Sequence, residues 1–388
     1  MSVDMIHQSE NLFALQARCL TSNAAGAARE IDRLGLWEYV ASEACIHQVG
    51  GALIHALRER GIVIPASAAG QLDAFAEHVA AANTFSISRM SHIFARLLAA
   101  EVPFLVLKGA ALNATVYPAA GLRGMADVDV LIRPEDAERV DGLLIDAGCC
   151  RGPDLVQDDF YPRYYYEREY LTPTVPAVKI DLHVRPFRPM RYGQTIGPEA
   201  LWDDPMGVEI GSCQVQIPNP ENMLILLCAH AAFHGLTELK WLYDIKVWLE
   251  RYGATMDLKA VGAKCRRWGL SAVVRAALEK TLVVFAEPSA VLIKAIHRIE
   301  GRAKLLDRLV LWQAPRDEAH PIAHVLVNAL CTPGVLHRLG YLAAVLAPGK
   351  HHLGQLYEGR HVGWPVVAHL VRVGRAMAKP FTAAPTSA

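Results

Sequence analysis

The stretch LRGMADVDVLI, residues 122–132, decides the fold. Its second half places two acidic residues and two valines in strict alternation, which is typical of a strand with one polar and one buried face. Asp127 and Asp129 therefore project from the same face, while Val128 and Val130 point into apolar packing. Two carboxylates side by side repel each other, and a divalent cation between them would remove that cost. Hard oxygen ligands in this arrangement suit Mg²⁺.

A second strand-like segment, KIDLHV at residues 179–184, carries a further carboxylate. Its aliphatic residues share one face, and Lys179, Asp181 and His183 share the other. If this strand lies beside the first, three carboxylates converge in the layout of a two-metal site for phosphoryl or nucleotidyl transfer. Asp181 would then bind the catalytic metal and help to activate the acceptor, and His183 is a candidate to contact substrate.

Upstream, FLVLKGAA at residues 104–111 predicts a short buried strand that ends in a glycine and a helix. Gly109 at the helix start would let a phosphate approach backbone N–H groups, and the helix dipole favours an anion there. A simple turn glycine is the alternative. Lys108 is a candidate to add a positive charge for the phosphates. Arg123 is a second candidate, with a structural ion pair as an equal alternative.

Three regions that differ in composition and in the periodicity of their apolar residues follow one another along the chain. Residues 1–100 are rich in alanine and show helical periodicity, although Asn83 interrupts the apolar series. Residues 101–218 form the strand-rich catalytic region, residues 219–380 are helical again, and a disordered tail is expected over 381–388. The sequence thus predicts an α+β protein in which a small mixed sheet with flanking helices lies between N- and C-terminal helical regions.

Within the catalytic region the patterns predict four strands, at residues 104–107, 128–132, 161–171 and 178–184. A short helix follows the first strand, and a second helix begins at Pro134 and ends at Gly148. The C-terminal region opens with a helix capped by Asn219, and a second helix is expected over residues 239–249.

His230 and His234 lie one turn apart on the first helix of the C-terminal region. Such spacing can bind zinc, but Ala231 stands where a zinc-protease motif has glutamate. Buried packing against the catalytic region, with a hydrogen bond to Asp244, is the favoured interpretation. His230 is also a candidate to contact the nucleotide or the acceptor.

The overall composition argues against several classes of protein. The chain of 388 residues has 39 basic and 39 acidic residues, so no electrostatic footprint points to nucleic acid. Its eight cysteines contain no CxxC pair, which indicates reduced, mostly buried thiols of a cytoplasmic protein. No signal peptide is evident at the N-terminus, and the longest apolar stretch, residues 223–236, is too short to span a bilayer.

Together these motifs resemble the uncharacterised bacterial nucleotidyltransferase family of the polymerase-β-like superfamily, over roughly residues 85–250. The segments that carry the resemblance are LKG at 107–109, LRGMADVDVL at 122–131, IDLH at 180–183 and LKWLYDI at 239–245. One departure is Ala110, which stands where the wider superfamily has a phosphate-contacting serine.

The resemblance implies a nucleotidyltransferase fold with Mg²⁺ (or Mn²⁺) held by Asp127, Asp129 and Asp181. It also implies transfer of a nucleoside monophosphate from a nucleoside triphosphate to an acceptor, which is a peptide, a protein or a small molecule. Two alternatives stay open. One is phosphoryl or sugar-phosphate transfer on the same scaffold, and the other is an inactive nucleotide-binding scaffold.

Overall fold

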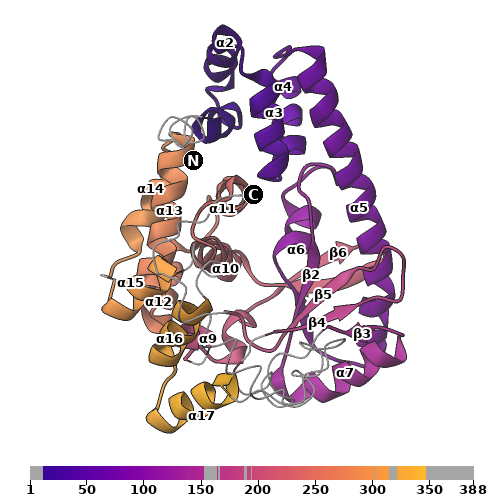
Figure 1. Cartoon of the computed structure of the whole chain (residues 1–388), viewed down its shortest axis with the longest axis vertical. Coiled ribbons are helices and arrows are strands. Elements are labelled where there is room, and N and C mark those ends of the chain that lie inside the picture. Colours follow the sequence, from indigo (N-terminus) through magenta and orange to yellow (C-terminus); the bar gives the residue numbers. More distant parts are fainter. Residues whose placement is uncertain are drawn as a thin grey trace, which may run out of the picture.

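A mixed sheet lies between helical segments that come from both ends of the chain (Figure 1). This arrangement confirms the predicted α+β class with its N- and C-terminal helical regions. The computed structural model describes residues 12–152, 164, 167–187, 190–193, 195–301, 303–313 and 321–346. The helical structure expected between 347 and 380 and the tail expected over 381–388 lie outside these residues.

In the described residues the sheet has seven strands, in the order β3-β4-β5-β2-β1-β7-β6. At the centre, β2 pairs in parallel with β5 and antiparallel with β1. The strand bounds are Phe104–Val106 for β1, Asp127–Ile132 for β2, Cys150–Arg151 for β3, Glu167–Leu171 for β4, Lys179–His183 for β5, Met206–Ile210 for β6 and Cys213–Ile217 for β7.

Patterns in the sequence predicted part of this sheet. The strand expected over 161–171 corresponds to β4 in its second half, and residues 161–163 and 165–166 lie outside the described part of the chain. The β6–β7 hairpin was not predicted. It turns at Gly211, whose φ of 61° lies in the left-handed region, and β7 then extends the sheet beside β1.

Helices of three groups surround the sheet. The N-terminal group is α2 (Ala24–Leu34), α3 (Trp37–Ile46), α4 (Gly50–Glu59) and α5 (Ala66–Ala99). Helices within the sheet region are α6 (Lys108–Thr115), η1 (Pro134–Asp136), α7 (Ala137–Asp146), α9 (Met190–Gly193) and η2 (Pro198–Leu201). The C-terminal group is α10 (Pro220–Phe233), α11 (Leu239–Tyr252), α12 (Leu258–Trp268), α13 (Ser271–Phe285), α14 (Ala290–Arg298), α15 (Leu305–Gln313), α16 (Pro321–Cys331) and α17 (Val335–Leu346).

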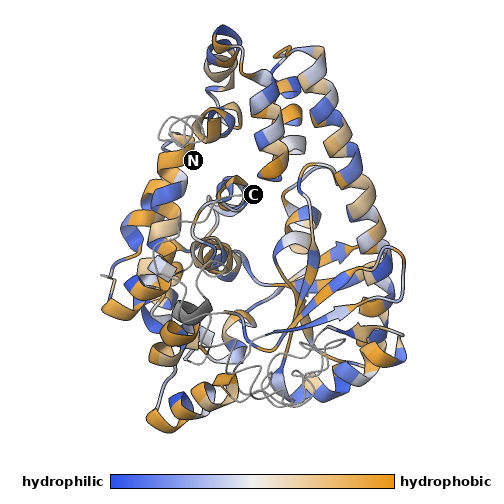
Figure 2. Cartoon of the chain, in the orientation of Figure 1, coloured by the Kyte–Doolittle hydropathy of each residue, from blue (hydrophilic) through white to orange (hydrophobic). Residues whose placement is uncertain are grey.

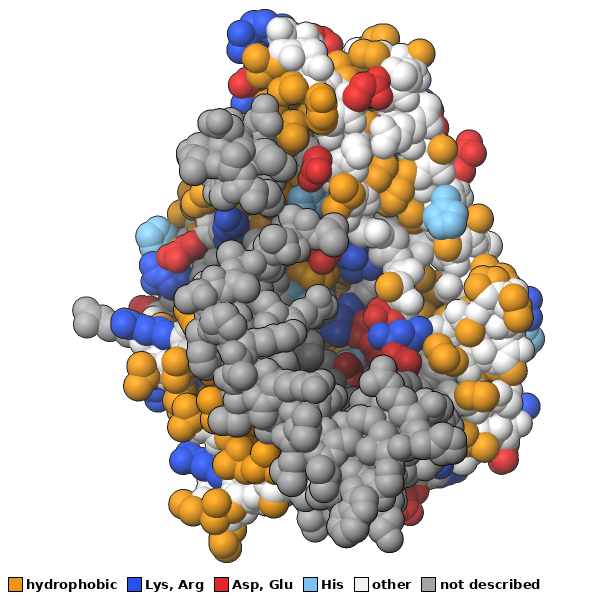
Figure 3. Space-filling view, viewed as in Figure 1, with side chains coloured by type: hydrophobic (Ala, Val, Ile, Leu, Met, Phe, Trp, Pro, Cys, Tyr) orange, Lys and Arg blue, Asp and Glu red, His pale blue; other side chains and the backbone are white. Residues whose placement is uncertain are grey.

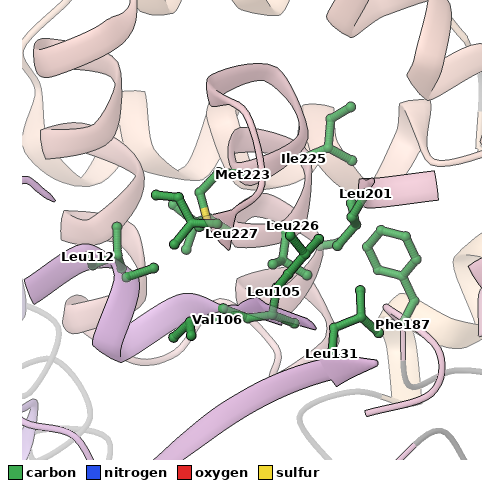
Figure 4. Packing of buried hydrophobic residues seen from close by; sticks show 14 of the residues in the cluster. Leu105, Val106, Leu112, Leu131, Phe187, Leu201, Met223, Ile225, Leu226 and Leu227 are labelled. Carbon is green, nitrogen blue, oxygen red and sulfur yellow. The ribbon is translucent and has the colours of Figure 1, made fainter. Parts of the chain in front are cut away.

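Helix α10 is the central element of the C-terminal group. It begins as predicted, with the Asn219 side chain accepting a hydrogen bond from the Asn222 N–H at 2.9 Å. Apolar residues cover it on almost every side, which is typical of a fully buried helix. Leu226 and Leu227 belong to the same core as Leu105 of β1, so α10 packs directly on the sheet region (Figure 4).

The N-terminal helices pack against both the sheet and the C-terminal helices. The long α5 alternates apolar and polar residues along its length (Figure 2). Its Phe94 stacks on Phe104 of β1 with ring centroids 5.6 Å apart. Leu239 and Leu242 of α11 are buried in one cluster with α2, α3 and α4. The N-terminal helices therefore share a core with helices of the C-terminal group.

Asn83 interrupts the apolar series of α5 because it binds a loop. It is buried, and its side-chain NH₂ donates to the carbonyl oxygens of Ala120 and Arg123, both at 2.7 Å. Its side-chain oxygen accepts from the Met125 N–H at 3.2 Å. Asn83 therefore holds the loop that leads into β2.

A buried ion pair connects that loop to α11. The Arg123 guanidinium donates from Nε and Nη2 to the two oxygens of Asp244, both at 2.9 Å. The Tyr117 hydroxyl donates to Asp244 at 2.7 Å. Within the described residues these two side chains are the partners of the Asp244 carboxylate, so the expected hydrogen bond to His230 or His234 is wrong.

The described residues contain no helix long and apolar enough to cross a membrane. All eight cysteines are free thiols, and they are buried except for Cys45 and Cys150.

Asp244→Ala should lower the free energy of unfolding by about 3–5 kcal/mol, because it leaves the Arg123 charge buried without its partner. Chemical denaturation of the purified protein measures this change. The control is Asp73→Ala, which breaks the exposed Arg58–Asp73 pair and should cost less than about 1 kcal/mol. Equal losses in the two variants would contradict the importance of the Arg123–Asp244 pair.

Candidate active site

Parallel pairing of β2 with β5 brings the predicted carboxylates together. Asp129 lies opposite Asp181, and Asp127 lies opposite Lys179. On the next strand, Glu169 of β4 lies opposite Asp181. Because side chains alternate between faces, all of these residues project from one face of the sheet.

This face forms one wall of a cavity of about 330 Å³. Acidic, basic and histidine side chains gather in a hollow on the side of the molecule seen in Figure 3. The other walls come from the turn into α6 and from α10 and α11. Seven of the predicted site residues line the cavity: Lys108, Gly109, Arg123, Asp127, Asp129, Asp181 and His230. His183 does not line the cavity. It is almost completely buried, and its Nε2 lies next to Oδ1 of Asp129.

Asp129 is the most firmly held carboxylate of the face. Its Oδ1 accepts a hydrogen bond from Lys108 Nζ at 2.6 Å and lies 2.8 Å from His183 Nε2. Burial alone would raise the pKa of Asp129, but Lys108 and His183 hold it well below its usual range. Asp129 is therefore an anion at neutral pH, although it is only 4% exposed.

The backbone at Lys108 aims its side chain at Asp129. Lys108 has a φ of 45°, in the left-handed region that non-glycine residues seldom adopt. Its neighbour Leu107 donates a backbone hydrogen bond to the Asp129 carbonyl oxygen at 3.0 Å. Strained backbone of this kind costs on the order of 1–3 kcal/mol and is concentrated at functional sites. The sequence suggested Lys108 as a phosphate ligand, and the structure places it in an ion pair.

Lys179 lies among the remaining carboxylates. Its Nζ is 3.2 Å from an oxygen of Asp181, 3.5 Å from Glu169 and 3.6 Å from Asp127. Among the described residues, no group of three His, Cys, Asp or Glu side chains is already spaced to hold a metal ion. Lysine ammonium groups stand between the carboxylates in this state.

Glu167 and Glu169 belong to the same acidic face, although the sequence gave them no role. The signal was the alternation within β4, which places both glutamates on one side of the strand. Burial, together with Glu167 and Asp127, raises the pKa of Asp181 to about 7, and Lys179 opposes this rise. Asp181 therefore differs from Asp129, which is fully ionised.

Gly109 has a packing role in addition to the expected one. A Cβ atom at this position would lie 2.6 Å from Nη1 of Arg123 and 3.1 Å from Cγ of Met125. A side chain at this position would push against the guanidinium whose Nε and Nη2 bind Asp244. Arg123 thus lines the cavity while it holds the structural ion pair that the sequence analysis gave as its alternative.

The wall opposite the carboxylates is aromatic. His230 and His234 have ring centroids 4.6 Å apart, and each ring packs on Trp241, at 5.2 and 4.7 Å. Burial, and then the nearby charge of Lys108, lower the pKa of His230 well below its usual value. His230 is therefore a neutral ring at neutral pH. Trp241 lines the cavity as well.

Comparison with known proteins agrees with this geometry. A family model described as an uncharacterised nucleotidyltransferase matches residues 35–285, well over half of the chain. The chain belongs to this family, as its motifs indicated. The protein is accordingly a transferase of phosphorus-containing groups with a nucleotide as substrate. No curated protein gives a significant match.

Gly109→Ala should destabilise the protein by more than about 1 kcal/mol, because the new methyl group collides with the Arg123 guanidinium. The control is Gly142→Ala in α7, where nothing lies within 4 Å of the added atom. The control should be neutral or stabilising by up to about 1 kcal/mol, since alanine favours the helix. Thermal melting measures both effects. A Gly109→Ala variant as stable as the control would show that Arg123 does not need this space.

Proposed function

We propose that the protein transfers a nucleoside monophosphate from a nucleoside triphosphate to an acceptor in a reaction that needs Mg²⁺ or Mn²⁺. The observation that carries the proposal is the gathering of Asp127, Asp129 and Asp181 on one face of a cavity that the turn into α6 also lines. The family to which the chain belongs supports nucleotidyl transfer in general.

The donor set of the acidic face fits a divalent metal ion. Asp127, Asp129 and Asp181 offer carboxylate oxygens to one cavity, and such hard oxygens are the ligands that Mg²⁺ prefers. Asp127 and Asp129 would hold the metal of the triphosphate, and Asp181 would serve the acceptor side. When bound, the metal would neutralise the charge that develops on the transferred phosphoryl group.

The triphosphate would lie at the turn between β1 and α6. The first N–H groups of α6 have no partners within the helix, and the positive end of its dipole favours anions. Lys108 and Gly109 line the cavity at this turn. Lys108 would attract the phosphates as a point charge while it keeps Asp129 in place.

The aromatic wall of α10 and α11 would receive the rest of the ligands. His230, His234 and Trp241 offer uncharged flat surfaces at the side of the cavity away from the strands. A neutral imidazole such as His230 can donate or accept a hydrogen bond without repelling Lys108. We therefore assign His230 to the nucleotide or the acceptor.

Asp181 would act on the acceptor. Its carboxylate is 7% exposed and lies at the centre of the acidic face, between β2 and β4. From this position it would orient the acceptor hydroxyl or phosphate for attack and receive its proton. The chain needs to form few covalent bonds itself, because positioning and charge neutralisation account for most of the rate enhancement in phosphoryl transfer.

Binding of nucleoside triphosphate should require a divalent cation, because the carboxylates of the face repel a bare triphosphate. Calorimetric titration of ATP and of GTP, with Mg²⁺ and after EDTA treatment, measures this dependence. Equal affinity in the two conditions would contradict the metal site.

Asp181→Asn should leave much of the triphosphate affinity intact while it lowers turnover by orders of magnitude. Asp129→Asn should harm both, because it removes the best-ionised ligand. The matched control is Asp146→Asn, which changes an exposed aspartate at the end of α7 and should affect neither.

Turnover is followed by incubating the protein with labelled triphosphates and cell extract and weighing the labelled products by mass spectrometry. A product whose mass has increased by a nucleoside monophosphate indicates nucleotidyl transfer, whereas an increase by a phosphoryl group alone indicates phosphoryl transfer. Normal turnover by Asp181→Asn would exclude Asp181 from the chemistry. A wild-type protein that binds triphosphate and labels nothing would favour an inactive scaffold.

A further inference from the structure

Lys179 stands where a cation would be expected between the carboxylates of the two central strands. In the parallel register it lies opposite Asp127, and it is two residues from Asp181 on its own strand. Its ammonium lies within 3.6 Å of an oxygen of each, and within 3.5 Å of Glu169. One positive charge thus serves three carboxylates at once.

The ion pairs of Lys179 differ from those of Lys108. Lys108 makes one short contact to Asp129, 2.6 Å, and both side chains are nearly buried. The contacts of Lys179 are longer, 3.2–3.6 Å, and 35% of its side chain is exposed to solvent. Water reaches Lys179, Asp127 and Glu169, although the Asp181 side chain is only 9% exposed, and water weakens exposed ion pairs. Lys179 can therefore give way when another cation takes its place among the carboxylates, whereas Lys108 is held by one short, buried contact.

The carboxylates need a neighbouring cation, either the Lys179 ammonium or a metal ion. Asp127, Asp181 and Glu169 project from neighbouring positions of β2, β5 and β4, and like charges opposite one another destabilise a sheet. A cation among them offsets this repulsion. Lys179 supplies such a charge from within the chain.

We propose that Lys179 is an exchangeable counter-ion, which holds the place of a divalent cation between Asp127 and Asp181 and withdraws when the metal binds. This inference rests on the metal site of the proposed function. Metal binding must then compete with an internal ammonium group. The apparent affinity of the empty cavity for metal is accordingly lower than its carboxylates alone would provide.

Withdrawal of Lys179 couples the binding of metal to the binding of triphosphate. The released ammonium remains on a residue that lines the cavity, where the negative charge of a polyphosphate is available to it. A triphosphate therefore stabilises the metal-bound arrangement by giving Lys179 a new partner. Because such coupling is reciprocal, metal and triphosphate each strengthen the binding of the other.

The test measures binding of Mn²⁺ alone, without nucleotide, by calorimetry or by the electron paramagnetic resonance signal of free Mn²⁺. Lys179→Met should bind Mn²⁺ about tenfold more tightly than the wild type, which is ~1.4 kcal/mol. Lys179→Arg keeps the charge and should bind Mn²⁺ within about threefold of the wild type. Melting curves of all variants establish that each is folded.

A control separates competition at the site from the change in net charge. Arg133→Met removes a positive charge just beyond the far end of β2, where the side chain is exposed. It should leave the Mn²⁺ affinity unchanged within about twofold. A gain as large as that of Lys179→Met would overturn the proposal, because any lost cation would then have the same effect.

The remaining outcomes distinguish this inference from the proposed function. If Lys179→Met binds Mn²⁺ as the wild type does, or more weakly, Lys179 does not compete with metal, although the metal site itself survives. If neither protein binds Mn²⁺ at millimolar concentration with or without triphosphate, the metal site and the role of Lys179 fall together.

Discussion

The register between two parallel strands is the constraint on which the site depends. Pairing of β2 with β5 sets Asp129 beside Asp181 on one face, and it sets Val128 beside Ile180 on the other. The apolar face is buried against the core, so a slip by one residue would turn the aliphatic side chains toward the cavity and the carboxylates into the apolar core. Burial of the aliphatic face thus stabilises the register, and that register brings the like charges together.

The repulsion among those charges is offset from within the chain. Lys108 reaches Asp129 from a strained turn, and Lys179 reaches Asp127 and Asp181 from the neighbouring strand. The two lysines differ in depth and in the length of their contacts. We infer from this difference that Lys108 holds Asp129 in place, whereas Lys179 withdraws when ligands bind.

A second set of contacts explains why distant motifs occur together. The loop before β2 is held by Asn83 of α5, and its Arg123 is paired with Asp244 of α11. The segments LRGMAD and LKWLYDI are therefore two halves of one buried contact. The family match over residues 35–285 includes all three elements that these contacts join, which are the helices α5 and α11 and the strand β2.

Local patterns predicted the residues of the site, and long-range contacts decided their neighbours. The period of two in β2 and β5 was enough to place Asp127, Asp129 and Asp181 on polar faces. It could not show that the two strands pair, and it could not add Glu169 from a third strand. Such pairings depend on packing between segments far apart in the chain, which no local pattern records.

The partners of the positively charged side chains could not be predicted from the sequence either. Arg123 and Asp244 are separated by 121 positions, so the sequence left open whether Arg123 binds phosphate or a carboxylate. That Gly109 admits a phosphate stays a prediction, and no local pattern showed that it also makes room for the Arg123 side chain. The β6–β7 hairpin was missed although its local signal is present, because MGVEI and CQVQI both alternate apolar and polar residues around the turn at Gly211.

The most direct test of the central claim is a crystal structure with Mn²⁺ and a non-hydrolysable nucleoside triphosphate. The anomalous signal of manganese should lie about 2.1 Å from carboxylate oxygens of Asp127 and Asp129, with the phosphates at the start of α6. Manganese and triphosphate bound elsewhere, with Lys179 still among the carboxylates, would contradict the account.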